Sequence, residues 1–464
     1  MATDGERLGA DLDRRELLRL LGAGALALAV PSMPLLSAEP EGKPNIVLIL
    51  ADDLGYGELG VQGGRDIPTP HINSIAQAGV RFTQGYVSCP VCAPTRAGLM
   101  TGRYQQRFGL ETNPGPEASS PPDYGLPLDQ VTIAERLKSL GYATGMVGKW
   151  HLGYRQQFSP PRRGFDEFFG FLAGSDSYLP PRPGPILRGS EQVEEKEYLT
   201  DAFAREAVAF IGKHAREPFF LYLAPNAVHM PLQAPDRYLS RFAGIQDPTR
   251  RTFAAMLAAL DDTVGQVLAA LRKHRLDRNT LLVFLSDNGG PTARTTSGNG
   301  PLRGFKAQVL EGGIRIPFMA QWPGHITAGQ VYRQPVISLD LHATAVAAAG
   351  APLRPEWGLD GVDLLPYLRG KRTGAPHQAL FWRIRDQWAI RRGDWKLLAL
   401  PSGTPELYHL SEDVGEAHNL ADQMPDRVKE LTAAWQAWSS QLQAPRWSAA
   451  RRAARPRRRR RQTA

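Results

Sequence analysis

Short, continuous apolar runs spaced along the chain constrain the fold more than any other feature of this sequence. They occupy residues 45–51, 143–147, 219–223 and 281–285. Runs of this length without polar alternation suit strands that are buried on both faces. Helix-like stretches at 131–140, 198–214 and 253–274 lie between them. Strands that alternate with helices predict an α/β fold, with a mainly parallel sheet and helices on both sides.

The sequence pattern changes at about residue 375. Segments 379–384, 388–392 and 395–400 are short and aromatic-rich, and a helical stretch follows at 428–442. This pattern predicts a small antiparallel sheet with one helix. The chain has 464 residues, whereas a single core usually stops growing at about 250–300 residues. We therefore expect a large α/β domain at 43–374 and a small α+β domain at 375–443.

The first 38 residues have the pattern of an export signal. A polar stretch with Arg14 and Arg15 precedes an apolar run at 20–30, and helix breakers and small residues follow it. The run is shorter than the ~20 residues that cross a membrane, and residues 13–18 resemble a twin-arginine signal. We predict a bacterial-type exported protein, periplasmic or secreted, without a transmembrane span. The alternative is an uncleaved amphipathic helix.

The positive charge of the chain is concentrated at one end. The formal net charge is +9, and it falls to +1 without the eight arginines between residues 451 and 461. The body of the protein is therefore nearly neutral and offers no electrostatic reason to expect a nucleic-acid partner. We interpret 444–464 as a basic, disordered tail, the alternative being an anchor for an anionic surface or polyanion.

Polar side chains follow two of the predicted strands. Asp52 and Asp53 come after the first run, and Asp287 and Asn288 come after the run at 281–285. Binding crevices of open α/β sheets lie at the carboxyl ends of strands, so these residues are candidates for one shared site. An all-oxygen set suits Ca²⁺ or Mg²⁺ better than zinc. Taken alone, an Asp pair after a strand is more often a loop cap.

The sequence contains only two cysteines, Cys89 and Cys92, three positions apart. They permit one local disulfide at most, and a metal site would need ligands from elsewhere. The residues around Cys92 favour neither a redox pair nor a metal site. The segment runs Cys92-Ala93-Pro94-Thr95-Arg96 and continues Ala97-Gly98-Leu99-Met100-Thr101-Gly102-Arg103.

This segment resembles the first signature of the type I sulfatases, in which the Cys of a C-x-P-x-R core is oxidised to formylglycine. Residues 141–151, ending in Gly148-Lys149-Trp150-His151, resemble the second signature. Segments 226–231, 286–289 and 301–306 also fall where family motifs would. The resemblance covers roughly residues 43–442 and is greatest to arylsulfatases and N-acetylgalactosamine-6-sulfatases. Thr95 departs from the commoner Ser, which bears on how efficiently Cys92 is converted.

The resemblance implies an alkaline-phosphatase-like α/β domain followed by a smaller domain, in agreement with the pattern of strands and helices. It also implies one Ca²⁺, with Mg²⁺ less favoured, held by Asp52, Asp53, Asp287, Asn288 and the modified Cys92. Arg96 would hold the formylglycine, and Lys149 and Lys306 would neutralise sulfate oxygens. His229, with Lys306, would assist the leaving alkoxide, and His151 would accept the proton that triggers sulfate release.

The expected function is hydrolysis of a sulfate ester on a small molecule or, more specifically, a glycan, after maturation by a formylglycine-generating enzyme. One alternative is a phosphatase, phosphodiesterase or phosphonate hydrolase of the same superfamily. The presence of both lysines and both histidines favours sulfate. Another alternative is a catalytically silent protein that binds sulfated glycans through its arginine-rich tail. The loop at 113–124, rich in Pro, Ser and Gly, is a candidate cover for the pocket.

Overall fold

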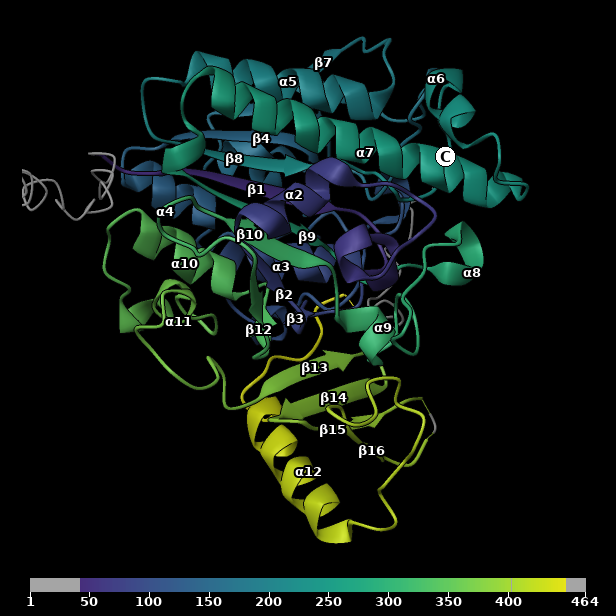
Figure 1. The fold of residues 1–464 in the computed structure, drawn as a ribbon. Helices are drawn as coiled ribbons and strands as arrows, with labels where there is room; N and C mark the ends of the chain where they lie inside the picture. The colour runs from purple at the N-terminus through teal and green to yellow at the C-terminus, as the bar shows by residue number, and fades with distance from the viewer. Residues whose placement is uncertain (1–41, 402, 448–464) are drawn as a thin grey trace, which may run out of the picture. The chain divides into compact units, whose positions relative to one another are not determined.

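A ten-stranded sheet forms the centre of the protein (Figure 1). The structure is a computed structural model that describes residues 42–401 and 403–447. The predicted export signal and residues 448–464 of the predicted basic tail lie outside the described residues. Figure 1 shows helices on both sides of the sheet, which confirms the predicted α/β class.

The large sheet is parallel at its centre and antiparallel near its edges. Strands β9, β1, β8, β4 and β5 run parallel to one another, whereas β10, β6 and β7 pair antiparallel with their neighbours. In sheet order the strands are β11 (Gln330–Tyr332), β2 (Val80–Phe82), β10 (Phe318–Gln321), β9 (Thr280–Ser286), β1 (Asn45–Ala51), β8 (Phe219–Ala224), β4 (Ala143–Lys149), β5 (Glu167–Phe171), β6 (Ile186–Arg188) and β7 (Glu191–Val193). The four apolar runs are therefore the central strands β1, β4, β8 and β9.

Two hydrophobic cores lie on opposite faces of this sheet. Alternate residues of β1 enter different cores, since Leu48 packs in one and Ile49 in the other. Helices α2 (Pro70–Ala78), α5 (Leu199–Lys213) and α7 (Pro248–Lys273) cover one face. Helices α3 (Cys92–Thr101), α4 (Ile133–Ser139) and α10 (Asp340–Ala348) cover the other. Burial on both faces explains why the strands are continuously apolar.

Helix α7 is long and apolar enough to cross a membrane, alone among the helices of the described residues. In the protein, 83% of its most apolar window is buried. Its apolar side chains pack in the same core as α2 and α5. We therefore assign α7 to the core of the α/β domain.

A second, small antiparallel sheet follows the large one, as predicted, and it has a fourth strand beyond the three predicted segments. It contains β13 (Leu380–Ile384), β14 (Gln387–Arg392), β15 (Trp395–Ala399) and β16 (Glu406–His409). Helix α12 (Pro425–Ser439) packs on it through Leu431, which joins Ile390, Leu397 and Leu407 in a small core. Trp447, within the predicted tail, is buried beside Tyr124, with ring centroids 4.7 Å apart.

Besides several 3-10 turns, the described chain also contains shorter strands and α-helices. They are β3 (Gly85–Tyr86), β12 (Val336–Ile337), α6 (Asp236–Leu239), α8 (Thr292–Thr295), α9 (Glu311–Ile314) and α11 (Leu365–Leu368). The indole N–H of Trp382 in β13 donates to the Val87 carbonyl at 2.7 Å, and its ring packs on Tyr86 at 5.4 Å. The small sheet is thus attached through buried contacts to the segment that leads into α3.

Candidate active site

Neighbouring strands bring the predicted acidic residues together. Strands β1 and β9 are parallel and in register, with Ala51 opposite Ser286, so the residues that follow them meet at one edge. The Asp53 N–H donates to Asp287 Oδ1 at 3.2 Å. Asp52, Asp53, Asp287 and Asn288 are all buried. The carboxyl ends of the strands therefore form one polar site, as the sequence predicts.

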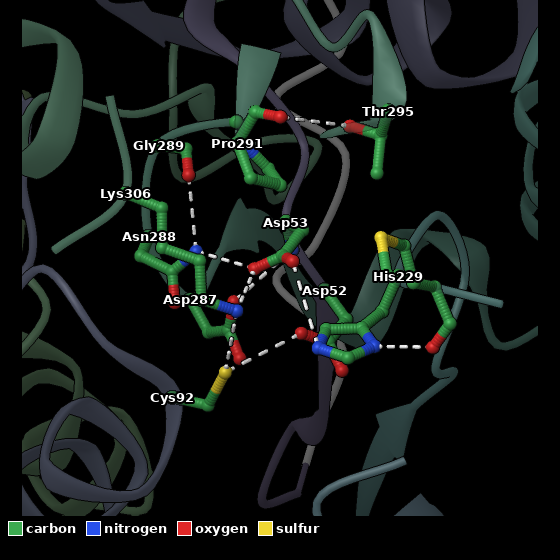
Figure 2. Close-up of polar contacts among 12 residues, drawn as sticks. Asp52, Asp53, Cys92, His229, Asp287, Asn288, Gly289, Pro291, Thr295 and Lys306 are labelled. Carbon is green, nitrogen blue, oxygen red and sulfur yellow. Dashed lines mark hydrogen bonds and ion pairs between the residues drawn. The ribbon is translucent and has the colours of Figure 1, made fainter. Parts of the chain in front are cut away.

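Cys92 is the first residue of α3 and faces this site (Figure 2). Its Sγ lies 3.7 Å from Asp52 Oδ1 and 3.3 Å from Lys306 Nζ. Burial, reinforced by the negative charge of Asp287, raises the pKa of the Cys92 thiol to about 12. Cys92 is therefore a protonated thiol at neutral pH, and unmodified it is a poor nucleophile.

The Cys92 segment is held rigidly at its start. Every residue of α3 is buried. The Thr95 hydroxyl donates to the Cys89 carbonyl at 2.5 Å, so the residue that departs from the commoner Ser keeps a hydroxyl in use. Gly98 allows the helix to approach its neighbours, because a Cβ there would lie 2.5 Å from Ser88 Oγ. Cys89 and Cys92 are both free and buried.

Buried cations are bound to the buried carboxylates. Arg96 donates from Nε and Nη2 to Asp287 Oδ2, at 3.1 and 2.9 Å, and from Nη1 to the Lys149 carbonyl at 2.9 Å. Lys149 Nζ lies 2.5 Å from Asp52 Oδ2, and Lys306 Nζ lies 2.6 Å from Asp53 Oδ1. Arg96, Lys149 and Lys306 thus balance the three carboxylates.

For the charged groups of this site, attraction between opposite charges outweighs the effect of burial on the pKa. Burial by itself pushes the pKa of Asp52 up, but Lys149, His229 and Arg96 bring it below the ordinary value. The pKa of Asp53 is likewise lowered, because Lys306 and His229 outweigh its burial. Burial opposes the charge of Lys306, yet Asp53 holds the pKa of this lysine well above its usual range. These aspartates and Lys306 are therefore charged at neutral pH.

Two histidines complete the site. Burial, with Lys149 and Arg96 nearby, holds the pKa of His151 well below its usual range, so the ring is neutral. His151 has a φ of 62° and fits against Gly174, where a Cβ would lie 2.6 Å from the ring Nε2. His229 Nδ1 lies 2.6 Å from the Met230 carbonyl, which can only accept a hydrogen bond. The other nitrogen, Nε2, faces Asp53 Oδ2 at 3.6 Å.

The donor atoms fit a hard divalent cation. One ligand atom from each of Asp52, Asp53, Cys92 and His229 lies within 4.8 Å of the others. The amide Nδ2 of Asn288 donates to Asp53 Oδ1 at 2.6 Å, whereas its buried Oδ1 has no partner among the described residues. A buried oxygen without a partner is costly unless a ligand binds it. Carboxylate and amide oxygens are the ligands that Ca²⁺ prefers.

Comparison with known proteins agrees with this geometry. The family model described as Sulfatase matches residues 44–351. The chain belongs to the sulfatase family. This sulfatase is 37% identical to arylsulfatase A of Homo sapiens, over 90% of the chain and 89% of that protein. It is 36% identical to the N-acetylgalactosamine-6-sulfatase of Mus musculus, over 81% of the chain and 75% of that protein.

A solved structure resembles this sulfatase over nearly the same extent. The structure of Ps i-CgsB in complex with k-i-k-neocarrahexaose has a TM-score of 0.85 and 36% sequence identity, covering 89% of this chain and 98% of that one. The predicted family and the predicted fold are both confirmed. The protein is an enzyme that hydrolyses sulfate esters.

A cavity of about 540 Å³ opens in front of Cys92, His151 and His229 in this sulfatase. Residues 113–117 of the predicted cover loop form one wall. Asn113 accepts the Ala93 N–H at 2.9 Å, and the Tyr154 hydroxyl donates to the Gly115 carbonyl at 2.9 Å. The wall is therefore anchored to the helix that carries Cys92.

The structure brings all the predicted site residues together at the carboxyl ends of β1 and β9 and around the floor of this cavity. Sequence reasoning missed Tyr154 and Asp176, which also line the cavity. Neither belongs to a recognisable motif. The Tyr154 position, three residues after His151, is the only signal that could have indicated a role near the pocket.

Proposed function

We propose that this sulfatase removes sulfate from a carbohydrate, using a formylglycine made from Cys92 and one bound Ca²⁺. The observation that carries the proposal is the position of Cys92 Sγ, between Asp52 Oδ1 and Lys306 Nζ at the floor of the cavity. The protonated thiol is a weak nucleophile, which supports a need for modification.

The two implied groups would supply complementary chemistry. Once formed, the hydrated formylglycine supplies two hydroxyls on one carbon, one to attack sulfur and one whose deprotonation releases sulfate. A Ca²⁺ held by Asp52, Asp53, Asp287 and Asn288 would supply positive charge beside the sulfate oxygens. The modified side chain of residue 92 would share this site. The unpartnered Asn288 Oδ1 supports the assignment.

The cations of the site are positioned for a sulfate anion. Lys149 and Lys306 are fixed by Asp52 and Asp53, so little reorganisation is needed for them to stabilise negative charge on sulfate oxygens. Arg96 lies one helical turn after Cys92, on the same face of α3. Its bonds to Asp287 and to the Lys149 carbonyl hold it where it orients the residue-92 side chain.

The histidines have distinct proposed roles. His151, whose lowered pKa leaves the ring unprotonated, has a free nitrogen for the proton whose loss triggers sulfate release. His229 presents Nε2 to the site from a ring oriented by the Met230 carbonyl, and when protonated it donates to the leaving alkoxide together with Lys306. Both rings line the cavity.

The carbohydrate assignment rests on size and on similar proteins. The cavity volume falls within the range of roughly 300–1,000 Å³ that is common for small ligands. Similar proteins include an N-acetylgalactosamine-6-sulfatase and Ps i-CgsB in complex with k-i-k-neocarrahexaose. We further propose export to the periplasm or beyond, through a twin-arginine-like signal, and maturation by a formylglycine-generating enzyme.

Mass spectrometry of the Cys92 peptide tests the proposal, with protein made in its native host or together with a formylglycine-generating enzyme. We expect a mass shift that matches conversion of the thiol to an aldehyde. The same preparation should hydrolyse 4-nitrophenyl sulfate faster than 4-nitrophenyl phosphate. Unmodified Cys92 in an active preparation would contradict the formylglycine mechanism, and a preference for phosphate would favour a phosphoester hydrolase.

A further inference from the structure

The outer part of the cavity has an unusual charge distribution for an enzyme that binds sulfate. Its floor contains Cys92, His151 and His229, behind which Arg96, Lys149 and Lys306 are bound to carboxylates. Among the described residues that line the cavity there is no lysine or arginine. The walls instead carry two carboxylates, Glu117 and Asp176. Away from the floor, the described lining therefore offers no lysine or arginine to a second sulfate.

Asp176 lies shortly after β5 and is only 3% exposed. Its Oδ1 accepts the Ser177 N–H at 2.7 Å. The Gly184 backbone N–H also faces the carboxylate, and a Cβ on Gly184 would lie 2.7 Å from Oδ2. Oδ2 nevertheless has no partner in hydrogen-bonding geometry among the described residues. A buried acceptor left open beside a cavity is suited to a donor from a ligand.

The neighbouring Arg182 side chain does not donate a hydrogen bond to Asp176 Oδ2. Arg182 and Asp176 attract one another electrostatically. The Arg182 guanidinium, however, donates to the backbone carbonyls of Tyr178, Glu195 and Glu197. Arg182 therefore links its loop to the segment after β7, and Asp176 Oδ2 keeps no hydrogen-bond partner among the described residues.

We propose that Asp176 determines specificity by accepting a hydrogen bond from a ring hydroxyl beside the scissile sulfate. The cavity then selects a sugar ring that carries one sulfate and is otherwise uncharged, and it disfavours rings with a second sulfate or a carboxylate. This inference rests on the proposed carbohydrate sulfatase function and names its substrate class.

The selection follows from charge and hydration. The apolar side chains of Phe171, Leu172 and Leu187 line the same cavity, and an apolar surrounding strengthens electrostatic interactions. A hydroxyl donates to the carboxylate, whereas a second sulfate can only bring like charge to it. A hydrogen bond to a charged group changes affinity by roughly 10- to 100-fold, and we expect selectivity of that size.

The test compares kcat/KM for galactose and N-acetylgalactosamine rings sulfated at one position with values for their disulfated counterparts. Wild type, Asp176→Asn and Asp386→Asn are measured, with 4-nitrophenyl sulfate as a substrate that presents no sugar hydroxyl. Asparagine can still accept the Ser177 N–H but removes the charge. Asp386, exposed in the β13–β14 turn, is the matched control.

We expect wild type and Asp386→Asn to prefer the monosulfated ring by roughly 10- to 100-fold. In Asp176→Asn the preference should shrink at least about fivefold, whereas Asp386→Asn should keep both the preference and the rate on 4-nitrophenyl sulfate. Equal rates on both rings in wild type, an unchanged preference in Asp176→Asn, or cleavage of the aryl ester without cleavage of any ring would overturn the inference. If formylglycine-bearing enzyme cleaves no sulfate ester, the proposed function itself fails.

Discussion

Two clusters of buried charge differ in how completely the protein satisfies them. The active-site cluster consists of Asp52, Asp53, Asp287, Arg96, Lys149 and Lys306. The interface cluster consists of Glu311, Lys396 and Glu416, where the small sheet meets α9. In the interface cluster, Lys396 Nζ lies 2.9 Å from Glu311 Oε1 and 2.7 Å from Glu416 Oε1, and all three side chains are inaccessible to solvent.

The side chains of the interface cluster are inaccessible to solvent, so their partners are internal to the protein. The Tyr86 hydroxyl donates to Glu311 Oε2 at 2.7 Å, and Arg315 Nη1 lies 3.3 Å from the same oxygen. The active-site cluster is open, because Lys306 keeps 17% of its side-chain area exposed and the neighbouring His229 keeps 20%. Charge with only internal partners stabilises the fold, whereas charge beside a cavity is available to a ligand.

The largest effect that separates the clusters should come from Cys92→Ala. Loss of the residue that becomes the nucleophile should lower kcat by at least about 10⁴-fold. The free energy of unfolding should change by less than about 1 kcal/mol, since the charge pairs around the residue remain. Hydrolysis of 4-nitrophenyl sulfate and urea denaturation measure the two quantities. Substantial residual turnover would show that Cys92 is not the source of the nucleophile.

Lys396→Met should produce the opposite result. It leaves two buried carboxylates without their shared cation, which should lower the free energy of unfolding by about 3–5 kcal/mol. The protein that remains folded should keep kcat within a few-fold, because Lys396 lies outside the cavity. Adding Glu416→Gln should restore part of the stability. A stable but inactive Lys396→Met variant would show that the interface cluster serves catalysis instead.

The sequence predicts the active-site cluster far better than the interface cluster. Strands buried on both faces are continuously apolar, so β1 and β9 are recognisable, and the aspartates at their ends follow from the parallel arrangement. The signature around Cys92 identifies the family. Lys396 and Glu416 have no such context. Lys396 lies in a short aromatic-rich strand, and its burial depends on Glu311, 85 residues earlier.

The residue that we propose to set the specificity of the pocket also cannot be recognised from the sequence. Asp176 lies in a loop without a motif, and its environment depends on how this loop folds back to bring Gly184 against its carboxylate at the cavity. The edge strands β6 and β7 have only three residues each, too few for a periodic pattern. Tertiary packing decides these features, and no sequence motif indicates it.

Calcium should stabilise the protein by binding to the active-site cluster and not to the interface cluster. Binding to the folded state alone adds about 4 kcal/mol when free Ca²⁺ exceeds its Kd by 1,000-fold. A chelator should therefore lower the Tm and Ca²⁺ should restore it. Asn288→Ala should weaken this response, and Glu416→Gln should retain it. A chelator response that is identical in Asn288→Ala would place the cation elsewhere.

The smallest expected effect is a pH dependence of stability from Glu416. Burial raises its pKa from 4.5 to about 7, although Lys396 opposes the rise. Between these pH values the folded state binds more protons than the unfolded state, so the free energy of unfolding falls as pH rises, by at most about 3 kcal/mol. Glu311 does not mask this trend, because its pKa is lowered to about 2 and its contribution is lost only in acid.

Urea denaturation at pH 5 and pH 8 measures this contribution as the difference between wild type and Glu416→Gln, which cancels the other titrating groups. Wild type should lose more stability than the variant over this range, and the exposed control Glu412→Gln should behave like wild type. A wild-type protein that is no more sensitive to this pH change than Glu416→Gln would mean that Lys396 keeps both glutamates ionised. The three side chains of the interface cluster would then carry a net negative charge. For that charge to stay buried, Arg315 would have to stabilise the ionised Glu311 more strongly than the Tyr86 hydroxyl does.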